Sequence, residues 1–145
     1  IGSVNKKSVF SAVDLVPTLL DLAQIPHPKG ISYDGESVPE ILLGKSKNSR
    51  KQDIFFRRPP DRDSFYGVKD LPDLAVRSGK WKLLCEYDGS DALLYDLAKD
   101  RGETKDLSEN HPEIVNRLSK AVIAWHQSMP PDNGPALASK PKKKK

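Results

Sequence analysis

Apolar and polar residues alternate between Leu74 and Leu97, and the rest of the chain can be arranged around this stretch. Its sequence, LAVRSGKWKLLCEYDGSDALLYDL, follows the period of two that is typical of strands with one buried face. Ser78-Gly79 suits a two-residue hairpin loop, because glycine adopts a positive φ without a side-chain clash. Residues 88–91 predict a second turn. We therefore expect three antiparallel strands whose apolar face is formed by Leu74, Val76, Trp81, Leu83, Cys85, Tyr87, Leu93, Tyr95 and Leu97.

A helical pattern follows this predicted sheet. Pro112 suits the first position of a helix and Glu113 its positive end, and apolar residues then recur at steps of four, four and three: Ile114, Leu118, Val122 and Trp125. A small sheet with one apolar face needs a covering layer. We expect the helix over residues 112–128 to cover it, with Trp81 filling the space between them, and the run Ile54-Phe55-Phe56 to add a fourth strand.

Two further helices are predicted nearer the N-terminus. Residues 8–13 alternate weakly and suggest a short strand, after which Asp14 can cap a helix that runs to Ala23. Pro17 is compatible with that helix because it falls within the first turn. Residues 37–43 predict a short second helix with Ser37 as its cap, closed by a glycine at position 44. The fold class is therefore α+β, a small antiparallel sheet of three to four strands packed against a C-terminal helix.

Length and composition narrow the class of protein. The chain has 145 residues, enough for one domain with a real core, and no apolar run approaches the ~20 residues that span a bilayer. The net charge is +4, but Lys140 and residues 142–145 contribute five positive charges, so the rest of the chain carries −1. The single cysteine, Cys85, excludes an internal disulfide, and its place in the apolar row favours a packed thiol over a nucleophile.

Several short motifs, taken in order, resemble the sulfatases of the alkaline-phosphatase-like superfamily, in particular their C-terminal portion. The motifs are DLVPTLL at residues 14–20, DGES at 34–37 with LLG at 42–44, AVRSGKWKL at 75–83, LYDL at 94–97, the turn at 100–107 and HPE at 111–113. Together they cover about 125 residues. Arg101-Gly102 and Asp106 depart from the family's usual turn residues. The resemblance extends to arylsulfatases, N-acetylgalactosamine-6-sulfatase and N-sulphoglucosamine sulphohydrolase.

This resemblance implies that the parent protein hydrolyses the sulfate esters of sulfated carbohydrates, and that this chain supplies scaffold and pocket rim without being active alone. It implies that residues 1–25 form the edge of a larger α/β catalytic domain and residues 26–129 a C-terminal subdomain. Residues 130–145 have too little apolar surface to fold, and we expect them to be a disordered Lys-rich tail. Calcium and a formylglycine are expected in the complete enzyme, but no C/S-x-P-x-R motif occurs here. The family suggests a periplasmic, secreted or lysosomal location.

The candidate substrate contacts are Arg57, Arg58, Arg62 and Tyr66, in a long connection that also carries Phe65. Guanidinium groups bind sulfate oxygens in pairs, so these residues suggest a rim for a sulfated sugar; the plainer alternative is a solvated loop. No metal or catalytic role is expected for the scattered residues His27, His111 and His126.

The partners follow from the same reasoning. We expect an N-terminal sulfatase catalytic domain and a sulfated carbohydrate, with self-association through residues 1–25 when the first is missing. The lysine tail has no interleaved aromatic residues, so no specific nucleic-acid binding is expected. The alternative function is a stand-alone module that binds polyanions or sulfated glycans.

Overall fold

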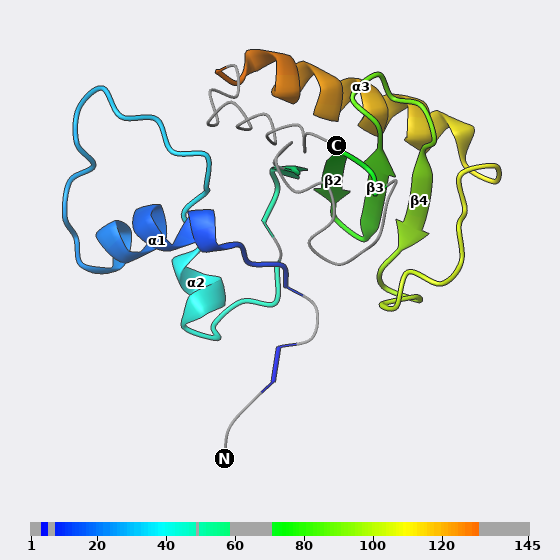
Figure 1. Cartoon of the computed structure of the whole chain (residues 1–145). Coiled ribbons are helices and arrows are strands. Elements are labelled where there is room, and N and C mark those ends of the chain that lie inside the picture. The colour runs from blue at the N-terminus through cyan, green and yellow to red at the C-terminus, as the bar shows by residue number, and fades with distance from the viewer. Residues whose placement is uncertain (1–3, 6–7, 49, 59–70, 131–145) are drawn as a thin grey trace, which may run out of the picture. The chain divides into compact units, whose positions relative to one another are not determined.

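The computed structural model describes residues 4–5, 8–48, 50–58 and 71–130. It divides into two compact units, the first formed mainly by residues 1–54 and the second mainly by residues 55–145, with the hairpin tip at 77–80 grouped with the first. Figure 1 shows α1 and α2 in the first unit, and the sheet with α3 in the second. The elements are η1 (Ala12–Asp14), α1 (Leu15–Leu22), α2 (Pro39–Leu42), β1 (Ile54–Arg57), β2 (Leu74–Ser78), β3 (Trp81–Cys85), β4 (Leu93–Asp96) and α3 (Pro112–Ser128).

The second unit is the predicted sheet and helix. Its four strands lie in the order β1-β2-β3-β4, and β3 pairs with β4 in antiparallel register. α3 spans the predicted residues and lies across one face of the sheet (Figure 1). The α+β fold class, the fourth strand and the covering helix are thus confirmed. The hairpin turn is one residue later than predicted: Ser78 ends β2, and Gly79, with φ of 57°, and Lys80 form the loop.

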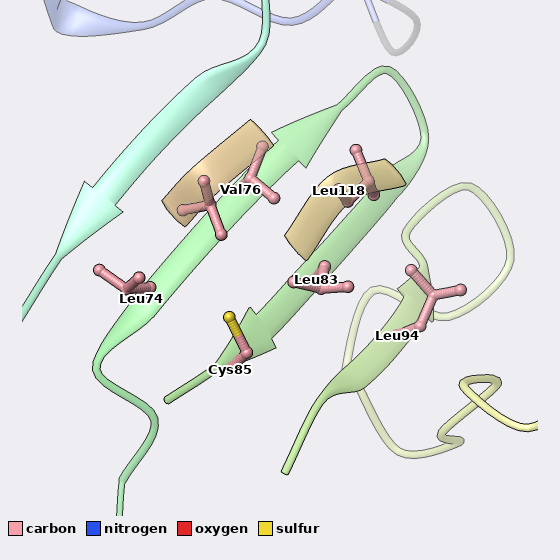
Figure 2. Close-up of a cluster of buried hydrophobic side chains, with 7 residues drawn as sticks. Leu74, Val76, Leu83, Cys85, Leu94 and Leu118 are labelled. Carbon is pink, nitrogen blue, oxygen red and sulfur yellow. The ribbon is translucent and has the colours of Figure 1, made fainter. Parts of the chain in front are cut away.

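The core of this unit lies between the sheet and α3. Figure 2 shows side chains from three strands and the helix meeting there. Seven fully buried residues make up the cluster: Leu74, Val76, Leu83, Cys85, Leu94, Leu118 and Val122. Trp81 is only half-buried at its edge, where its ring lies 4.9 Å from that of His111. The predicted helix stripe is confirmed, since Ile114 and Trp125 pack against the same cluster.

The predicted buried row of the last strand, Leu93, Tyr95 and Leu97, is wrong except at Tyr95, which is buried. Leu94, not Leu93, belongs to the core, because the register places Leu94 opposite the buried Leu83 and so on the same face. Residues directly opposite each other on paired strands share a face. A turn of uncertain length between two strands leaves this register undetermined in the sequence, and a shift of one residue exchanges the two faces. Leu93 is half-buried on the other side.

The first unit differs from the prediction in three details. No strand occurs at residues 8–13; residues 12–14 form the short helix η1 instead. Asp14 precedes α1 but its side chain makes no capping hydrogen bond to that helix, and α2 begins after Val38, so Ser37 is not its cap. Both side chains have other partners within the unit. In the described part of the chain, no helix is both long and apolar enough to cross a membrane.

Candidate functional site

Two of the predicted substrate contacts lie in the described residues. Arg57 ends β1 and Arg58 follows it, while Arg62 and Tyr66 lie outside the described residues. Successive strand residues point to opposite faces. Phe55 stacks on Trp125 of α3, with ring centroids 5.4 Å apart, so Arg57 lies on the helix side of the sheet and Arg58 on the other side. The two guanidinium groups therefore border the same sheet end from opposite faces.

Arg58 is held in place by a neighbouring carboxylate. Its Nη2 donates to Asp73 Oδ1 at 3.0 Å, its backbone N–H donates to the carbonyl of Asp73 at 2.8 Å, and its own carbonyl accepts from the hydroxyl of Tyr87 at 3.3 Å. Arg57 has no ion pair among the described residues. Within the described part of the chain, Arg58 is thus the arginine held by an ion pair, and Arg57 is not.

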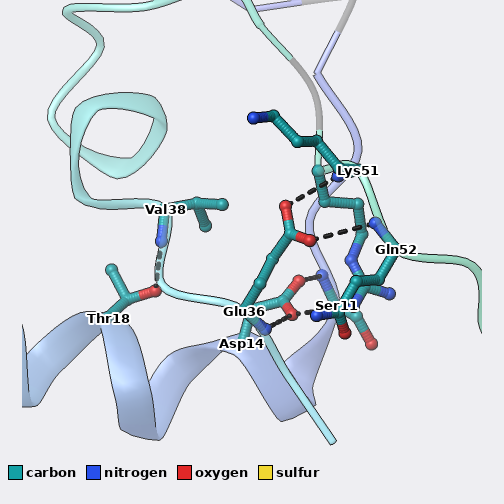
Figure 3. A network of polar contacts seen from close by, with 8 residues as sticks. Ser11, Asp14, Thr18, Glu36, Val38, Lys51 and Gln52 are labelled. Carbon is teal, nitrogen blue, oxygen red and sulfur yellow. Dashed lines mark hydrogen bonds and ion pairs between the residues drawn. The ribbon is translucent and has the colours of Figure 1, made fainter.

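A second polar cluster, which we call the helix junction, is formed by the polar side of η1 and α1 with residues 35–38. Figure 3 shows it from close by. The buried carboxylate of Asp14 accepts from the backbone N–H of Ser11 at 2.9 Å and of Glu36 at 3.0 Å. One turn further, the hydroxyl of Thr18 accepts from the backbone N–H of Val38 at 3.0 Å. The helix therefore binds the crossing segment through its polar side.

The crossing segment needs a glycine. A Cβ at Gly35 would lie 2.0 Å from the carbonyl oxygen of Val13 and 2.7 Å from the backbone nitrogen of Asp14. Backbone therefore packs directly against backbone at this point, and only glycine leaves the room. The motifs DLVPTLL and DGES, which the sequence presents as separate markers, are the two halves of one contact.

The junction continues to the segment that leads into β1. The carboxylate of Glu36 accepts from the backbone N–H groups of Lys51, at 2.7 Å, and Gln52, at 3.0 Å (Figure 3). Arg50 is buried beside Asp14, with Nη2 3.2 Å from Asp14 Oδ1. Its guanidinium nitrogens make no hydrogen bond to the described residues. Two carboxylates thus fix three segments that are distant in sequence.

The end of α1 has a similar arrangement. Asp21 accepts from the hydroxyl of Ser37 and pairs with His27, whose Nε2 lies 2.9 Å from Asp21 Oδ1. The hydrogen bond from Ser37, and then the one with His27, hold the pKa of Asp21 below its usual value. Asp21 lies between the serine and the histidine, so the histidine does not contact the hydroxyl as a general base would have to. The arrangement ties the loop together and is not a catalytic triad.

The apolar side of α1 faces solvent. Asp14, Pro17 and Thr18 are buried, whereas Val16 is 53% and Leu19 52% exposed. A helix on the surface of a finished domain normally shows the opposite distribution. The other large apolar side chains exposed in this unit are Val4, Phe10, Val13, Leu15, Ile25, Ile31, Leu42 and Leu43.

The remaining candidate residues, one cysteine and two histidines, are packed against other side chains. Burial, followed by the nearby negative charges, raises the pKa of the Cys85 thiol to about 11, so it stays protonated and unreactive at neutral pH. His111 lies against Trp81, and His126 against Tyr87 with ring centroids 4.8 Å apart. Within the described residues, no three His, Cys, Asp or Glu side chains are grouped to hold a metal ion. These residues offer no fit for calcium.

The sequence indicates Arg57 and Arg58 as candidates, whose substrate role stays a prediction, but it does not indicate the helix junction. Asp14 and Ser37 were interpreted as helix caps, because such residues usually bind the nearest free backbone N–H groups. A signal was present in the polar spacing of Asp14, Thr18 and Asp21, which places them on one side of the helix, opposite the apolar residues. That pattern indicates an amphipathic helix, but it does not reveal which side is covered within the chain.

Comparison with known proteins shows which family this chain matches. Residues 2–128 match the family described as N-sulphoglucosamine sulphohydrolase, C-terminal. The chain is 34% identical over 119 residues to arylsulfatase K of Mus musculus, covering 79% of this chain and 21% of that protein. It spans about a fifth of the length of the first curated relatives that it matches.

Two solved structures show the same fold. One is a Bacteroides thetaiotaomicron protein from work on the metabolism of multiple glycosaminoglycans, with a TM-score of 0.63 and 23% identity, covering 83% of this chain and 25% of that one. The other is Ps i-CgsB in complex with k-i-k-neocarrahexaose, with a TM-score of 0.60 and 20% identity, covering 81% of this chain and 24% of that one.

Proposed function

Because this chain belongs to the sulfatase family, as a C-terminal region of the N-sulphoglucosamine sulphohydrolase type, we propose that it works as the C-terminal part of an enzyme that hydrolyses sulfate esters of carbohydrates. In this proposal the chain supplies scaffold and part of the substrate rim. The attacking group, a formylglycine, and a calcium ion belong to the larger N-terminal part. There the formylglycine, a modified residue of the chain, would supply the nucleophile, and a bound calcium ion would supply the positive charge that sulfate transfer requires.

The observation that carries this proposal is the reversed orientation of α1. Its polar side is satisfied by the helix junction, and its apolar side is left to water. Covering a patch that includes Val16 and Leu19 would remove apolar area from water at roughly 25 cal/mol per Å². A partner is therefore expected, and we propose the N-terminal catalytic part of the sulfatase, with the boundary near residue 25 as its edge. A stand-alone polyanion-binding module would not need such a face.

The proposed substrate class is a sulfated carbohydrate. Arg57 and Arg58 supply positive charge at the end of β1, and guanidinium groups match sulfate oxygens in geometry. Arg62 and Tyr66 are proposed to extend the rim. The structural relatives support the carbohydrate class, since one comes from glycosaminoglycan metabolism and the other holds a neocarrahexaose.

The test begins with the reading frame. We expect a C/S-x-P-x-R motif in frame upstream of Ile1, and the protein made from the whole frame should release sulfate from sulfated oligosaccharides. The present chain alone should release none above a heat-treated control. A stop codon directly upstream, or steady sulfate release by the chain alone, would overturn the proposal.

The rim is tested within the complete enzyme. Replacing Arg57 by glutamine should lower kcat/KM for a sulfated oligosaccharide by about tenfold, the effect of losing one charge-assisted hydrogen bond. Arg101→Gln, at an exposed turn, is the matched control and should leave kcat/KM unchanged. Equal values for the two variants would remove Arg57 from the rim while leaving the sulfatase assignment intact.

A further inference from the structure

Two pairs of aromatic rings lie at the C-terminal end of α3. Phe55 stacks on Trp125, with ring centroids 5.4 Å apart. Tyr87 lies against the neighbouring His126, with ring centroids 4.8 Å apart and ring planes inclined by 32°. Three of these four residues are half-buried, whereas Tyr87 is 36% exposed. Tyr87 is therefore the ring of this group that a ligand can reach.

The position of Tyr87 is fixed by its hydroxyl and by the turn that follows it. The hydroxyl donates to the backbone carbonyl of Arg58 at 3.3 Å. The turn is closed by a hydrogen bond from the backbone N–H of Gly89 to the carbonyl of Glu86 at 2.9 Å. A Cβ at Gly89 would lie 3.0 Å from Ile123 Cδ1, so the turn packs against α3. A ring that is already held in place loses little conformational freedom when a ligand binds.

The hydrogen bond from Tyr87 joins this ring to the predicted substrate rim. The backbone N–H of Arg58 donates to the carbonyl of Asp73 at 2.8 Å, and its guanidinium group pairs with the same residue at 3.0 Å. Arg57, next to it in the chain, lies on the helix side of the sheet, which is also the side on which Tyr87 meets α3. An exposed aromatic ring and a guanidinium group thus border the same end of the sheet on the same side.

This combination matches the two chemical parts of a sulfated sugar. A pyranose ring has an apolar face of C–H groups that packs against an aromatic ring, and sulfate oxygens fit a guanidinium group. Tyrosine and arginine are also among the residues that most often carry the binding energy of an interface. The plainer alternative is a structural tie, in which only the hydroxyl of Tyr87 matters.

We propose that Tyr87, supported from behind by His126, is a stacking surface for a pyranose ring whose sulfate group binds Arg57. The ligand class is a sulfated pyranoside, and the aromatic ring makes the rim selective for sulfated sugars over other polyanions. This inference rests on the proposed function, since it adds a residue to the rim that the proposed function assigns to Arg57 and Arg58.

The contact is tested on the full chain by NMR with a heparin-derived tetrasaccharide. Nuclear Overhauser effects should join the ring protons of Tyr87 to sugar ring protons, and none should join those of Tyr33. Tyr33 is the matched control, since its ring also meets that of a histidine, His27, with centroids 5.5 Å apart, in the first unit. If the tetrasaccharide shifts the resonances of Arg57 without reaching Tyr87, the inference is overturned and the rim stands. If it reaches neither residue, both fail, while the sulfatase assignment is decided separately by the upstream reading frame.

Substitutions distinguish stacking from the structural tie. Tyr87→Phe keeps the ring and should bind the tetrasaccharide within about twofold of the parent, whereas Tyr87→Leu should bind about tenfold more weakly. Tyr33→Leu should bind like the parent. Tripolyphosphate, which carries negative charge without a sugar ring, should bind all four proteins equally, because each keeps the same lysine tail.

The amide resonances of Leu83 and Leu94, in the core of the second unit, show whether each variant remains folded. Equal weakening by Tyr87→Phe and Tyr87→Leu would assign Tyr87 to the structural tie, and parental affinity of Tyr87→Leu would remove it from the rim. Either result overturns the inference. If Tyr87→Leu does not fold, the Overhauser effects of the parent protein decide.

Discussion

The substitution Gly35→Ala probes the helix junction most sharply. The new methyl group would lie 2.0 Å from the carbonyl oxygen of Val13, far inside van der Waals contact, so the crossing segment must move away from η1 and α1. That movement breaks the hydrogen bonds from the backbone N–H of Glu36 to Asp14 and of Val38 to Thr18.

The cost follows from those contacts. Each net hydrogen bond contributes about 0.5–1.5 kcal/mol, and a buried carboxylate that loses one of its donors adds about 1–3 kcal/mol. We expect a loss of about 3–5 kcal/mol, comparable with the stability of a small domain. Gly30→Ala is the matched control. A Cβ at Gly30 meets no atom within 4 Å, and its φ of 78° gives a strain of only about 1 kcal/mol.

Hydrogen exchange with NMR detection measures the outcome residue by residue. In Gly35→Ala the amides of Glu36 and Val38 should exchange as in an unstructured chain, while the amides of Leu83 and Leu94, in the second unit, keep their parental rates in the same sample. Gly30→Ala should retain most of the protection. Parental exchange rates at Glu36 and Val38 in Gly35→Ala would refute the close backbone contact.

Three further outcomes are expected. Leu118→Ala, in the core, should lower the free energy of unfolding by about 2–5 kcal/mol, whereas Leu19→Ala, at a half-exposed site, should change it by less than about 1 kcal/mol; equal urea midpoints would contradict the described core. Cys85, with its pKa raised to about 11, should resist iodoacetamide at pH 8.5 until urea unfolds the chain, and rapid labelling of the folded protein would disprove its burial. Asp106→Ala should destabilise the sheet by about 1–3 kcal/mol, because the backbone N–H of Leu94 donates to Asp106 at 2.9 Å; an unchanged thermal midpoint would show that this hydrogen bond adds no net stability.

The sequence predicts best where one periodic signal decides the structure. α3 has the predicted bounds, because a proline at its start and a regular apolar stripe both indicate them. Whether Leu93 or Leu94 is buried depends on the register between β3 and β4, which is set across a turn. Alternation within one strand does not determine that register. Strand alternation alone places Arg57 and Arg58 on opposite faces of the sheet. The ion pair of Arg58 with Asp73 joins residues fifteen positions apart, so it can be seen only in the folded structure.

The N-terminal unit was harder to predict for a different reason. Its polar groups bind segments distant in sequence, so local capping rules assigned Asp14 and Ser37 to the wrong partners. The feature that bears most on function is the exposed apolar side of α1. It can be recognised only when the polar side of the helix is known to be covered. The sequence shows an amphipathic helix, and the structure shows its orientation.

The central claim is that the N-terminal part of a sulfatase covers the exposed apolar side of α1. Hydrogen exchange on the isolated chain tests this claim most directly. At low protein concentration the amides of residues 15–23 should exchange far faster than those of residues 81–84, which lie in the second unit. The residues of α1 should become protected when the N-terminal part of the enzyme is added, or through self-association when the concentration rises. Equal protection of both segments, independent of concentration, would show that α1 is already fully packed and would contradict the account.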